Sequence, residues 1–133
     1  MRPISIKVEE FTTVNPITVS QEDSLDKVKT IMMEKDIRHL PVIDQGQPVG
    51  IISHRDVNLT HRFDLNFKLK AKDIMTADPY TVSFEANLDD VAFEMSRNKY
   101  GSAIVMDNND EVYGIFTSTD ALNALIEVLR KEA

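Results

Sequence analysis

The sequence predicts an α/β (α+β) fold built from two copies of one β-α-β-β-α unit. A short phrase occurs twice, at 50–56 and at 114–120. Each copy has a Gly, two apolar residues suited to a buried strand, a hydroxyl residue, and an Asp three positions after that hydroxyl. The preceding segment is also repeated, because residues 16–44 match residues 79–107. An internal repeat of this length predicts that one structural unit occurs twice.

Each repeat contains the same elements in the same order, and the residue types justify each element. A proline ends a short lead-in segment, and β-branched or aromatic residues then favour an extended piece. Polar N-cap residues precede apolar residues at helical spacing. Two short buried strands follow, separated by a turn, and a second helix begins after the hydroxyl residue. The expected elements are lead-ins at 10–15 and 73–78, extended pieces at 17–19 and 80–82, N-caps at Ser24 and Asn87, strands at 40–43, 49–52, 103–106 and 112–116, and a last helix from 121 to about 131.

We place the repeats at 1–66 and 67–133, with an ordered connection at 64–70. A repeat of this size is marginal alone, because a small chain buries a small fraction of its surface. We therefore expect the repeats to pack about a pseudo-two-fold axis, leaving two equivalent clefts at their junction. One face of the last helix carries an apolar stripe, which suits either the core or an interface: Leu122, Leu125, Ile126 and Leu129.

Composition and charge argue against several classes of partner. The net charge of −7 disfavours binding to a nucleic-acid backbone, although local basic clusters at Arg38-His39, His54-Arg55 and His61-Arg62 suit a small anion. Cysteine is absent, and the three histidines lack the close spacing of a metal site. We find neither a signal peptide nor a membrane span, which suggests a cytoplasmic protein.

The repeated phrase suits the recognition of a nucleotide. Its hydroxyl and carboxylate lie where a strand gives way to a helix, and a helix start offers unpaired N–H groups to a phosphate. The Asp can accept hydrogen bonds from two ribose hydroxyls. The same spacing is that of a capping box, and capping is compatible with ligand contact at neighbouring groups. We find no catalytic triad, phosphate-binding glycine loop or paired carboxylates, so we expect no enzyme activity and assign no catalytic residues.

The ordered set from about Phe11 to about Leu129 resembles tandem CBS domains, the Bateman module. The matching motifs are Asp73-Ile74-Met75-Thr76, the two Pro-x-Thr-Val pieces, Arg38-His39-Leu40-Pro41-Val42, and the repeated phrase. The resemblance implies a regulatory module that holds AMP, ADP, ATP or S-adenosylmethionine in the cleft between repeats. It also implies that the Asp contacts ribose, that the Ser or Thr contacts phosphate, and that the Thr-Val piece and the stretch before the next strand contact adenine.

The resemblance assigns eleven residues to each site. The first site comprises Thr18, Val19, Ile37, Arg38, His39, Leu40, Pro41, Ser53, His54, Arg55 and Asp56. The second site comprises Thr81, Val82, Tyr100, Gly101, Ser102, Ala103, Ile104, Thr117, Ser118, Thr119 and Asp120.

The two sites differ in charge. Arg and His residues at the first site suit a phosphate, because charge-assisted hydrogen bonds are strong. At the second site Gly, Ser and Thr replace them, with Lys99 nearby and Tyr100 placed to stack on a base. We therefore expect the phosphate tail at the first site.

The main hypothesis is a cytoplasmic, homodimeric sensor of adenine nucleotides that signals to a partner protein by changing repeat or dimer geometry. It would need no cofactor beyond its regulatory ligand, which Mg²⁺ would accompany in the case of ATP. Two alternatives are a ligand-free structural module for dimerisation or protein interaction, and a module that binds S-adenosylmethionine.

Overall fold

The computed structural model describes residues 5–62 and 68–131. The chain forms two compact units. Unit 2 is the continuous segment Pro16–Pro79, and unit 1 combines Met1–Asn15 with Tyr80–Ala133. Each unit has the mixed α/β architecture that the sequence predicts, with one four-stranded sheet.

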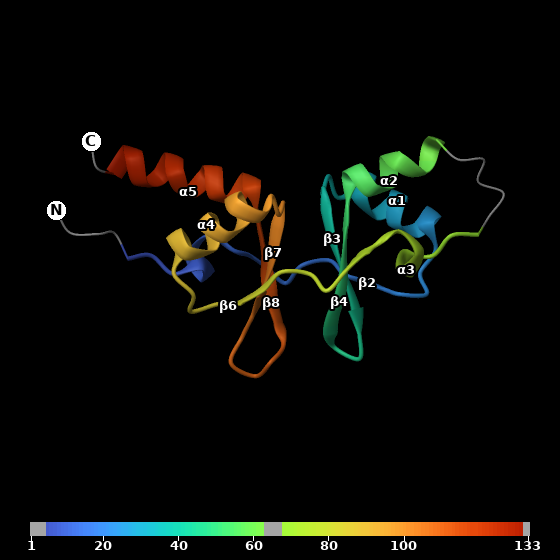
Figure 1. Ribbon diagram of the computed structural model, residues 1–133, viewed down its shortest axis with the longest axis horizontal. Helices are drawn as coiled ribbons and strands as arrows, with labels where there is room; N and C mark the ends of the chain where they lie inside the picture. Colours follow the sequence, from blue (N-terminus) through green and yellow to red (C-terminus); the bar gives the residue numbers. More distant parts are fainter. Residues whose placement is uncertain (1–4, 63–67, 132–133) are drawn as a thin grey trace. The chain divides into compact units, whose positions relative to one another are not determined.

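Unit 2 has the strand order β2-β3-β4-β5 (Figure 1). Its central pair is an antiparallel hairpin, and β2 joins that hairpin in parallel. Its core contains Val28 and Met32 from the first helix, Val57 from the second, and Leu40, Val42 and Ile52 from the sheet. The strands are β2 (Val19–Ser20), β3 (His39–Asp44), β4 (Gln47–Ser53) and β5 (Thr76–Ala77), and the helices are α1 (Leu25–Glu34), α2 (His54–Leu59), the 3-10 turn η2 (Thr60–Arg62) and α3 (Ala71–Ile74).

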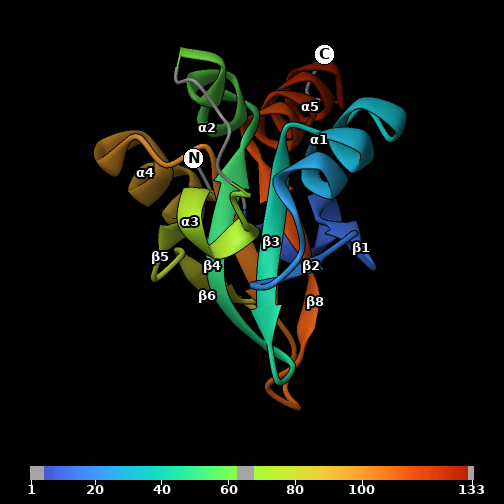
Figure 2. The same cartoon turned by 90° about the vertical axis from the view of Figure 1, so that its right-hand side faces the viewer.

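Unit 1 repeats this plan with the strand order β1-β8-β7-β6. Its helices α4 and α5 lie on the same face of the sheet, as Figures 1 and 2 show. Its core is built around Phe116, Val91, Met95 and Val105. The elements are η1 (Val8–Phe11), β1 (Thr13–Val14), β6 (Thr81–Ser83), α4 (Leu88–Asn98), β7 (Ser102–Met106), β8 (Val112–Thr117) and α5 (Ser118–Lys131).

The lead-in segments pack on the other repeat. Val8, two residues before the lead-in predicted at 10–15, is fully buried in the core of unit 1, and its N–H donates to the carbonyl of Ala86 at 2.8 Å. The equivalent Ala71 is fully buried in the core of unit 2, and its N–H donates to the carbonyl of Asp23 at 2.8 Å. The compact units therefore do not coincide with the sequence repeats placed at 1–66 and 67–133.

The exchanged segments explain the glycine that opens the repeated phrase. β1 pairs with β8 so that Val14 lies opposite Gly114, and β5 pairs with β4 so that Ala77 lies opposite Gly50. A Cβ atom on Gly114 would overlap the carbonyl oxygen of Thr13, and one on Gly50 would overlap the Met75 side chain. Gly114 is thus needed for the close approach of a lead-in backbone, whereas the overlap at Gly50 involves only a flexible side chain.

A charged cluster also holds one lead-in. Glu22, which precedes α1, accepts hydrogen bonds from Lys70 Nζ at 2.5 Å and from Lys72 Nζ at 2.9 Å. These two hydrogen bonds lower the pKa of Glu22 to about 2. The cluster is exposed to solvent, so salt screens its contribution to stability.

Most local predictions agree with the structure. Ser24 caps α1, because its Oγ accepts from the N–H of Lys27 at 3.1 Å. Asn87 occupies the N-cap position of α4, but its side chain makes no capping bond and accepts from Lys7 Nζ instead. Residues 64–67 of the connection predicted at 64–70 lie outside the described residues. No helix within the described ranges is long and apolar enough to cross a bilayer.

Candidate functional site

The strand-to-helix turn of unit 2 forms a complete capping box. Oδ2 of Asp56 accepts from the N–H of Ser53 at 2.8 Å, and Oγ of Ser53 accepts from the N–H of Asp56 at 3.1 Å. The capping reading of this spacing is therefore correct. Oδ1 of Asp56 has no hydrogen-bond partner among the described residues, and this half-buried carboxylate can still accept a hydroxyl.

The equivalent turn of unit 1 has one more partner. Oδ2 of Asp120 accepts from the N–H of Thr117 at 2.9 Å and from its hydroxyl at 3.2 Å. Oδ1 accepts from the Thr13 hydroxyl at 3.5 Å, a long and weak bond. Thr13 is absent from the predicted site because its lead-in was assigned to its own repeat. The signal that could have found it is its match to Thr76, which occupies the same register on the other sheet.

The helix starts offer fewer free N–H groups than the sequence suggested. The N–H of His54 donates to the carbonyl of Arg38 at 2.7 Å, and the N–H of Ser118 donates to the carbonyl of Gly101 at 3.1 Å. The capping hydroxyl takes the N–H of the Asp in each repeat. Backbone capture of a phosphate is therefore limited, and side chains carry most of the capacity to bind anions.

Cationic side chains concentrate in unit 2. Arg38 and Arg55 are exposed, and neither forms an ion pair with a described residue. Burial lowers the pKa of His39, and Arg38 lowers it further, while Asp56 opposes the shift. The lowered pKa favours the neutral, hydrogen-bonding form of His39 at pH 7.

Both units have a groove between their two helices. In unit 2 the groove has a volume of about 520 Å³, and Ile37, Arg38 and His54 of the predicted site line it together with Lys29, Asn58 and His61. In unit 1 the equivalent groove, of about 470 Å³, is lined by Tyr100, Gly101 and Ser118 together with Lys99. The capping carboxylates line neither groove, so the structure divides each predicted site into a groove part and a carboxylate part.

The ring of Tyr100 already has an aromatic neighbour. Its centroid lies 5.2 Å from that of Tyr80, with the rings tilted by 32°. Burial raises the pKa of the Tyr80 hydroxyl, which therefore stays protonated. Tyr100 is 44% exposed, so its outer face can still stack on a base.

Strand pairing and burial show where the remaining residues of the two predicted sites lie. His39 lies opposite Ser53, and Ser102 lies opposite Thr117, which brings the strand starts of β3 and β7 to the capping turns. The Thr-Val pieces lie on the neighbouring strand, where Val19 pairs with Val42, three positions beyond His39. Thr18, Thr81 and Thr119 are exposed and Val82 is half-buried, whereas six members are buried and offer a ligand mainly backbone groups: Val19, Leu40, Pro41, Ser102, Ala103 and Ile104.

Metal ligands do not gather in the part of the chain that the structure describes. No group of three or more His, Asp or Glu side chains is placed to hold an ion there.

The family model for the CBS domain matches residues 8–58 and 71–127. The chain therefore belongs to the CBS domain family and carries two copies of the domain.

Solved structures share this fold over nearly the whole chain. A Vibrio cholerae protein described as an acetoin utilization protein has a TM-score of 0.83 at 30% identity, and the match covers 98% of each chain. CBSX2, an Arabidopsis thaliana CBS-pair protein solved with AMP, has a TM-score of 0.78 at 27% identity, covering 92% of this chain and 97% of that one. A CBS domain pair solved with 5′-methylthioadenosine and S-adenosyl-L-methionine has a TM-score of 0.83 at 28% identity, with the same coverage.

The curated relatives are longer proteins. Inosine-5′-monophosphate dehydrogenase of Korarchaeum cryptofilum is 38% identical over 114 residues, which cover 86% of this chain and 23% of the enzyme. A protein of Methanocaldococcus jannaschii is 28% identical over 93% of this chain and 46% of its own length. The match thus covers 23% of the dehydrogenase and 46% of the second relative, so the chain spans less than half the length of either protein.

Proposed function

We propose that this chain is a regulatory module that binds an adenine nucleotide and signals to a partner protein through a change in repeat or dimer geometry. The observation that carries the proposal is the Asp of each repeated phrase. One carboxylate oxygen is fixed by the capping box, while the other faces no strong donor among the described residues. Such an anchored carboxylate suits the hydroxyls of a ribose. Related CBS pairs solved with AMP or with S-adenosylmethionine support an adenosine ligand.

The charge difference between the units supports a phosphate at the first site. Arg38 and Arg55 are exposed and free of ion pairs to described residues, while Gly101 and Thr119 occupy the equivalent positions in unit 1. One guanidinium group can donate two parallel hydrogen bonds to one phosphate, which adds affinity and fixes the orientation of the phosphate. The first site should therefore favour phosphorylated ligands, and the second should tolerate an uncharged substituent at the same place.

Calorimetric titration with AMP, ADP, ATP and S-adenosylmethionine tests the proposal. Asp56→Asn keeps one acceptor for the N–H of Ser53 but removes the second carboxylate oxygen, so helix capping survives and the ribose contact does not. We expect a loss of affinity of about tenfold or more at the first site, as for a hydrogen bond to a charged group. Asp120→Asn is the matched variant for the second site. Binding that neither variant weakens would contradict the proposed site, and the absence of binding by any adenosine compound would refute the function.

We assign the chain no catalytic activity of its own and expect a homodimer. A ligand that binds only the native state raises the melting temperature, and it shifts a conformational equilibrium only if its affinity differs between the two states. Sedimentation with and without AMP therefore checks whether occupancy changes assembly.

Two other functions remain as candidates. A ligand-free dimerisation module is favoured by the exposed apolar face of α5. An S-adenosylmethionine binder is favoured by the related complex with that compound, but the arginines of unit 2 favour an anionic ligand. The titration series separates these functions from nucleotide sensing.

A further inference from the structure

Each unit is closed by a segment that crosses from the other repeat, and the backbone holds both segments in the same way. We call residues 6–14 the first strap and residues 69–77 the second strap. Three backbone hydrogen bonds join the first strap to unit 1, at 2.7, 2.8 and 3.3 Å, with the N–H groups of Leu88, Val8 and Glu9 as donors. The equivalent three bonds join the second strap to unit 2, at 2.9, 2.8 and 3.1 Å, with the N–H groups of Leu25, Ala71 and Lys72 as donors. Differences in how the straps are held therefore arise mainly from side chains.

A cluster of opposite charges ties the second strap to unit 2. Glu22, which precedes α1, accepts hydrogen bonds from Lys70 Nζ at 2.5 Å and from Lys72 Nζ at 2.9 Å. Unit 1 has a carboxylate in place of one of these two lysines, because the corresponding residues are Glu85, Lys7 and Glu9. The described part of unit 1 contains no equivalent ion pair between its strap and the start of α4. Attraction between charges therefore closes one unit and not the other.

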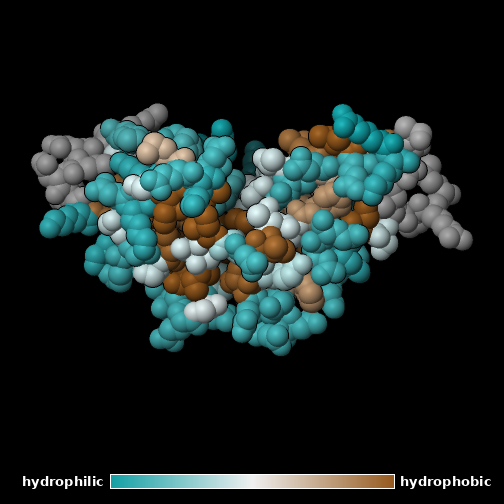
Figure 3. Space-filling view, turned by 180° about the vertical axis from the view of Figure 1, so that it is seen from behind, coloured by the Kyte–Doolittle hydropathy of each residue, from teal (hydrophilic) through white to brown (hydrophobic). Residues whose placement is uncertain are grey.

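This charge cluster is open to solvent. The side chains of Glu22, Lys70 and Lys72 are 60%, 45% and 43% exposed. Hydrophilic residues also form much of the surface of each unit, as Figure 3 shows for one face. Dissolved salt therefore reaches the cluster and screens its attraction, with a screening length that falls from about 30 Å at about 0.01 M to about 3 Å at about 1 M. The hold on the second strap should weaken as the ionic strength rises.

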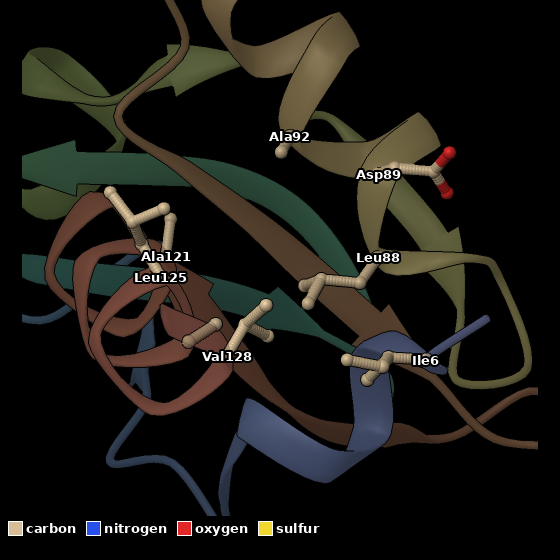
Figure 4. A pocket seen from close by; sticks show the side chains of 8 residues that line it. Ile6, Leu88, Asp89, Ala92, Ala121, Leu125 and Val128 are labelled. Atoms are coloured by element: carbon tan, nitrogen blue, oxygen red, sulfur yellow. The ribbon is translucent and has the colours of Figure 1, made fainter. Parts of the chain in front are cut away.

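Apolar side chains hold the first strap more than they hold the second. Val8 is fully buried, whereas the equivalent Ala71 of the second strap buries only a methyl group. Ile6 lines an apolar groove, and Figure 4 shows its side chain pointing toward Leu88 and Val128. Burial of apolar surface involves no charge, so sodium chloride does not screen it. The main hold on the first strap should therefore persist at high ionic strength.

The polar contacts of the first strap depend little on attraction between charges. Lys7 Nζ donates to the neutral side chain of Asn87 at 2.9 Å. The raised pKa of Lys131 in α5 is due mainly to its bond with Glu127 and only slightly to Glu10 of the first strap. These contacts therefore give salt little to screen.

We infer that the second strap is a salt-sensitive closure of unit 2, which loosens as the ionic strength rises while the first strap keeps unit 1 closed. The second strap ends in β5, where Thr76 pairs with Ile51 of β4, two positions before Ser53 of the capping turn. Loosening of this strap frees the edge of β4 next to the turn that carries Ser53 and Asp56. Ionic strength in this way acts on one candidate site and spares the other. That effect on a ligand rests on the proposed function, whereas the loosening of the strap does not.

Native-state hydrogen exchange of the whole chain tests the inference without a ligand. The amides of Ala71 and Lys72 report on the second strap, and those of Val8 and Glu9 report on the first. Between about 0.01 M and about 1 M sodium chloride, protection of the second strap should fall about two- to tenfold, as for one or two exposed ion pairs. Protection of the first strap should change less than about 1.5-fold. Equal salt dependence of the two straps, or none in the second, would overturn the inference.

The amide of Val28 separates loosening of the strap from unfolding of unit 2. It lies in α1 and donates to the carbonyl of Ser24 at 3.1 Å. Its protection should stay constant while that of Ala71 falls. A parallel loss of protection at Val28 and Ala71 would mean that the whole unit opens, which contradicts a strap that loosens by itself.

Charge variants give an independent test in hydrogen exchange. Glu22→Gln keeps a hydrogen-bond acceptor but removes the charge, so the second strap should lose most of its salt dependence. Glu9→Lys places a lysine where unit 2 has Lys72, with Glu85 as its partner, and should make the first strap salt-sensitive. Glu9→Gln is the matched control and should not. Salt dependence that survives in Glu22→Gln, or that fails to appear in Glu9→Lys, would refute the inference. Calorimetric titration of the same variants with AMP reports separately on the proposed function.

Discussion

Replacement of Gly114 by alanine tests how strongly the exchanged lead-in depends on a missing side chain. The added Cβ would overlap the carbonyl oxygen of Thr13 and the methyl group of Thr12, which are parts of one short segment. This segment cannot retreat without breaking the pairing of β1 with β8 and the bond from the Asn15 N–H to the Tyr113 carbonyl at 3.2 Å.

The magnitude follows from these contacts. Loss of two or three backbone hydrogen bonds costs about 2–3 kcal/mol, at a central value of about 1 kcal/mol each. Alanine also lowers the conformational entropy of the unfolded chain, which offsets about 0.4–1 kcal/mol of this loss of stability. We therefore expect Gly114→Ala to lower the free energy of unfolding by about 1–3 kcal/mol.

Gly50→Ala is the matched control in the other unit. There the new Cβ would meet mainly the Sδ and Cγ atoms of Met75, a flexible side chain that can turn away. The expected change is within about 1 kcal/mol of zero. Urea unfolding measures both variants, and hydrogen exchange at Asn15 reports whether β1 has left the sheet. The reasoning fails if Gly114→Ala is as stable as the wild type, or if Gly50→Ala costs more.

Three further predictions follow from the charged and polar contacts. Because the pKa of Glu22 in the folded chain, about 2, lies below its ordinary value of 4.5, this residue contributes stability above pH 4.5 and loses that contribution as the pH falls toward 2. The difference in melting temperature between the wild type and Glu22→Gln should therefore shrink over that range and in high salt. Arg38→Ala should weaken AMP binding about tenfold, whereas His39→Gln, which replaces a neutral group, should change it less than about threefold in calorimetry at pH 7. Thr13→Val should change affinity only at the Asp120 site, which calorimetry in an Asp56→Asn background can isolate.

The order of the elements was predictable because each depends on local pattern. Residues close together in sequence determine the cap at Ser24, the helix that follows it and the strand after Arg38. The structure contains all three. The exchange of the lead-ins was not predictable in the same way. Val8 and Ala71 occupy equivalent positions in nearly equivalent repeats, so either core offers each of them a similar apolar site. Local chemistry cannot distinguish two such partners, and only the folded chain does.

The same argument applies to the site. The capping boxes of Asp56 and Asp120 are local and appear as the spacing predicts, whereas the lowered pKa of His39 results from burial that sequence neighbours do not determine. Thr13 joins Asp120 only because the lead-in crosses to the other repeat. Residues far apart in sequence thus complete a site whose centre is local.

The exchange has a consequence for any attempt to divide the chain. A fragment of residues 67–133 would keep Asp120 and its capping box but would lose Val8 from the core and Thr13 from the carboxylate. It would also expose the edge of β8 that β1 covers, and unpaired strand edges promote aggregation. Each repeat therefore needs the exchanged segment of the other for its sheet and its core, and the Asp120 site also contains Thr13 from that segment. For that reason, regulation by a ligand is best measured on the whole chain. There Thr13 in β1, which donates to Asp120, is followed directly in sequence by β2, the strand that contains Val19.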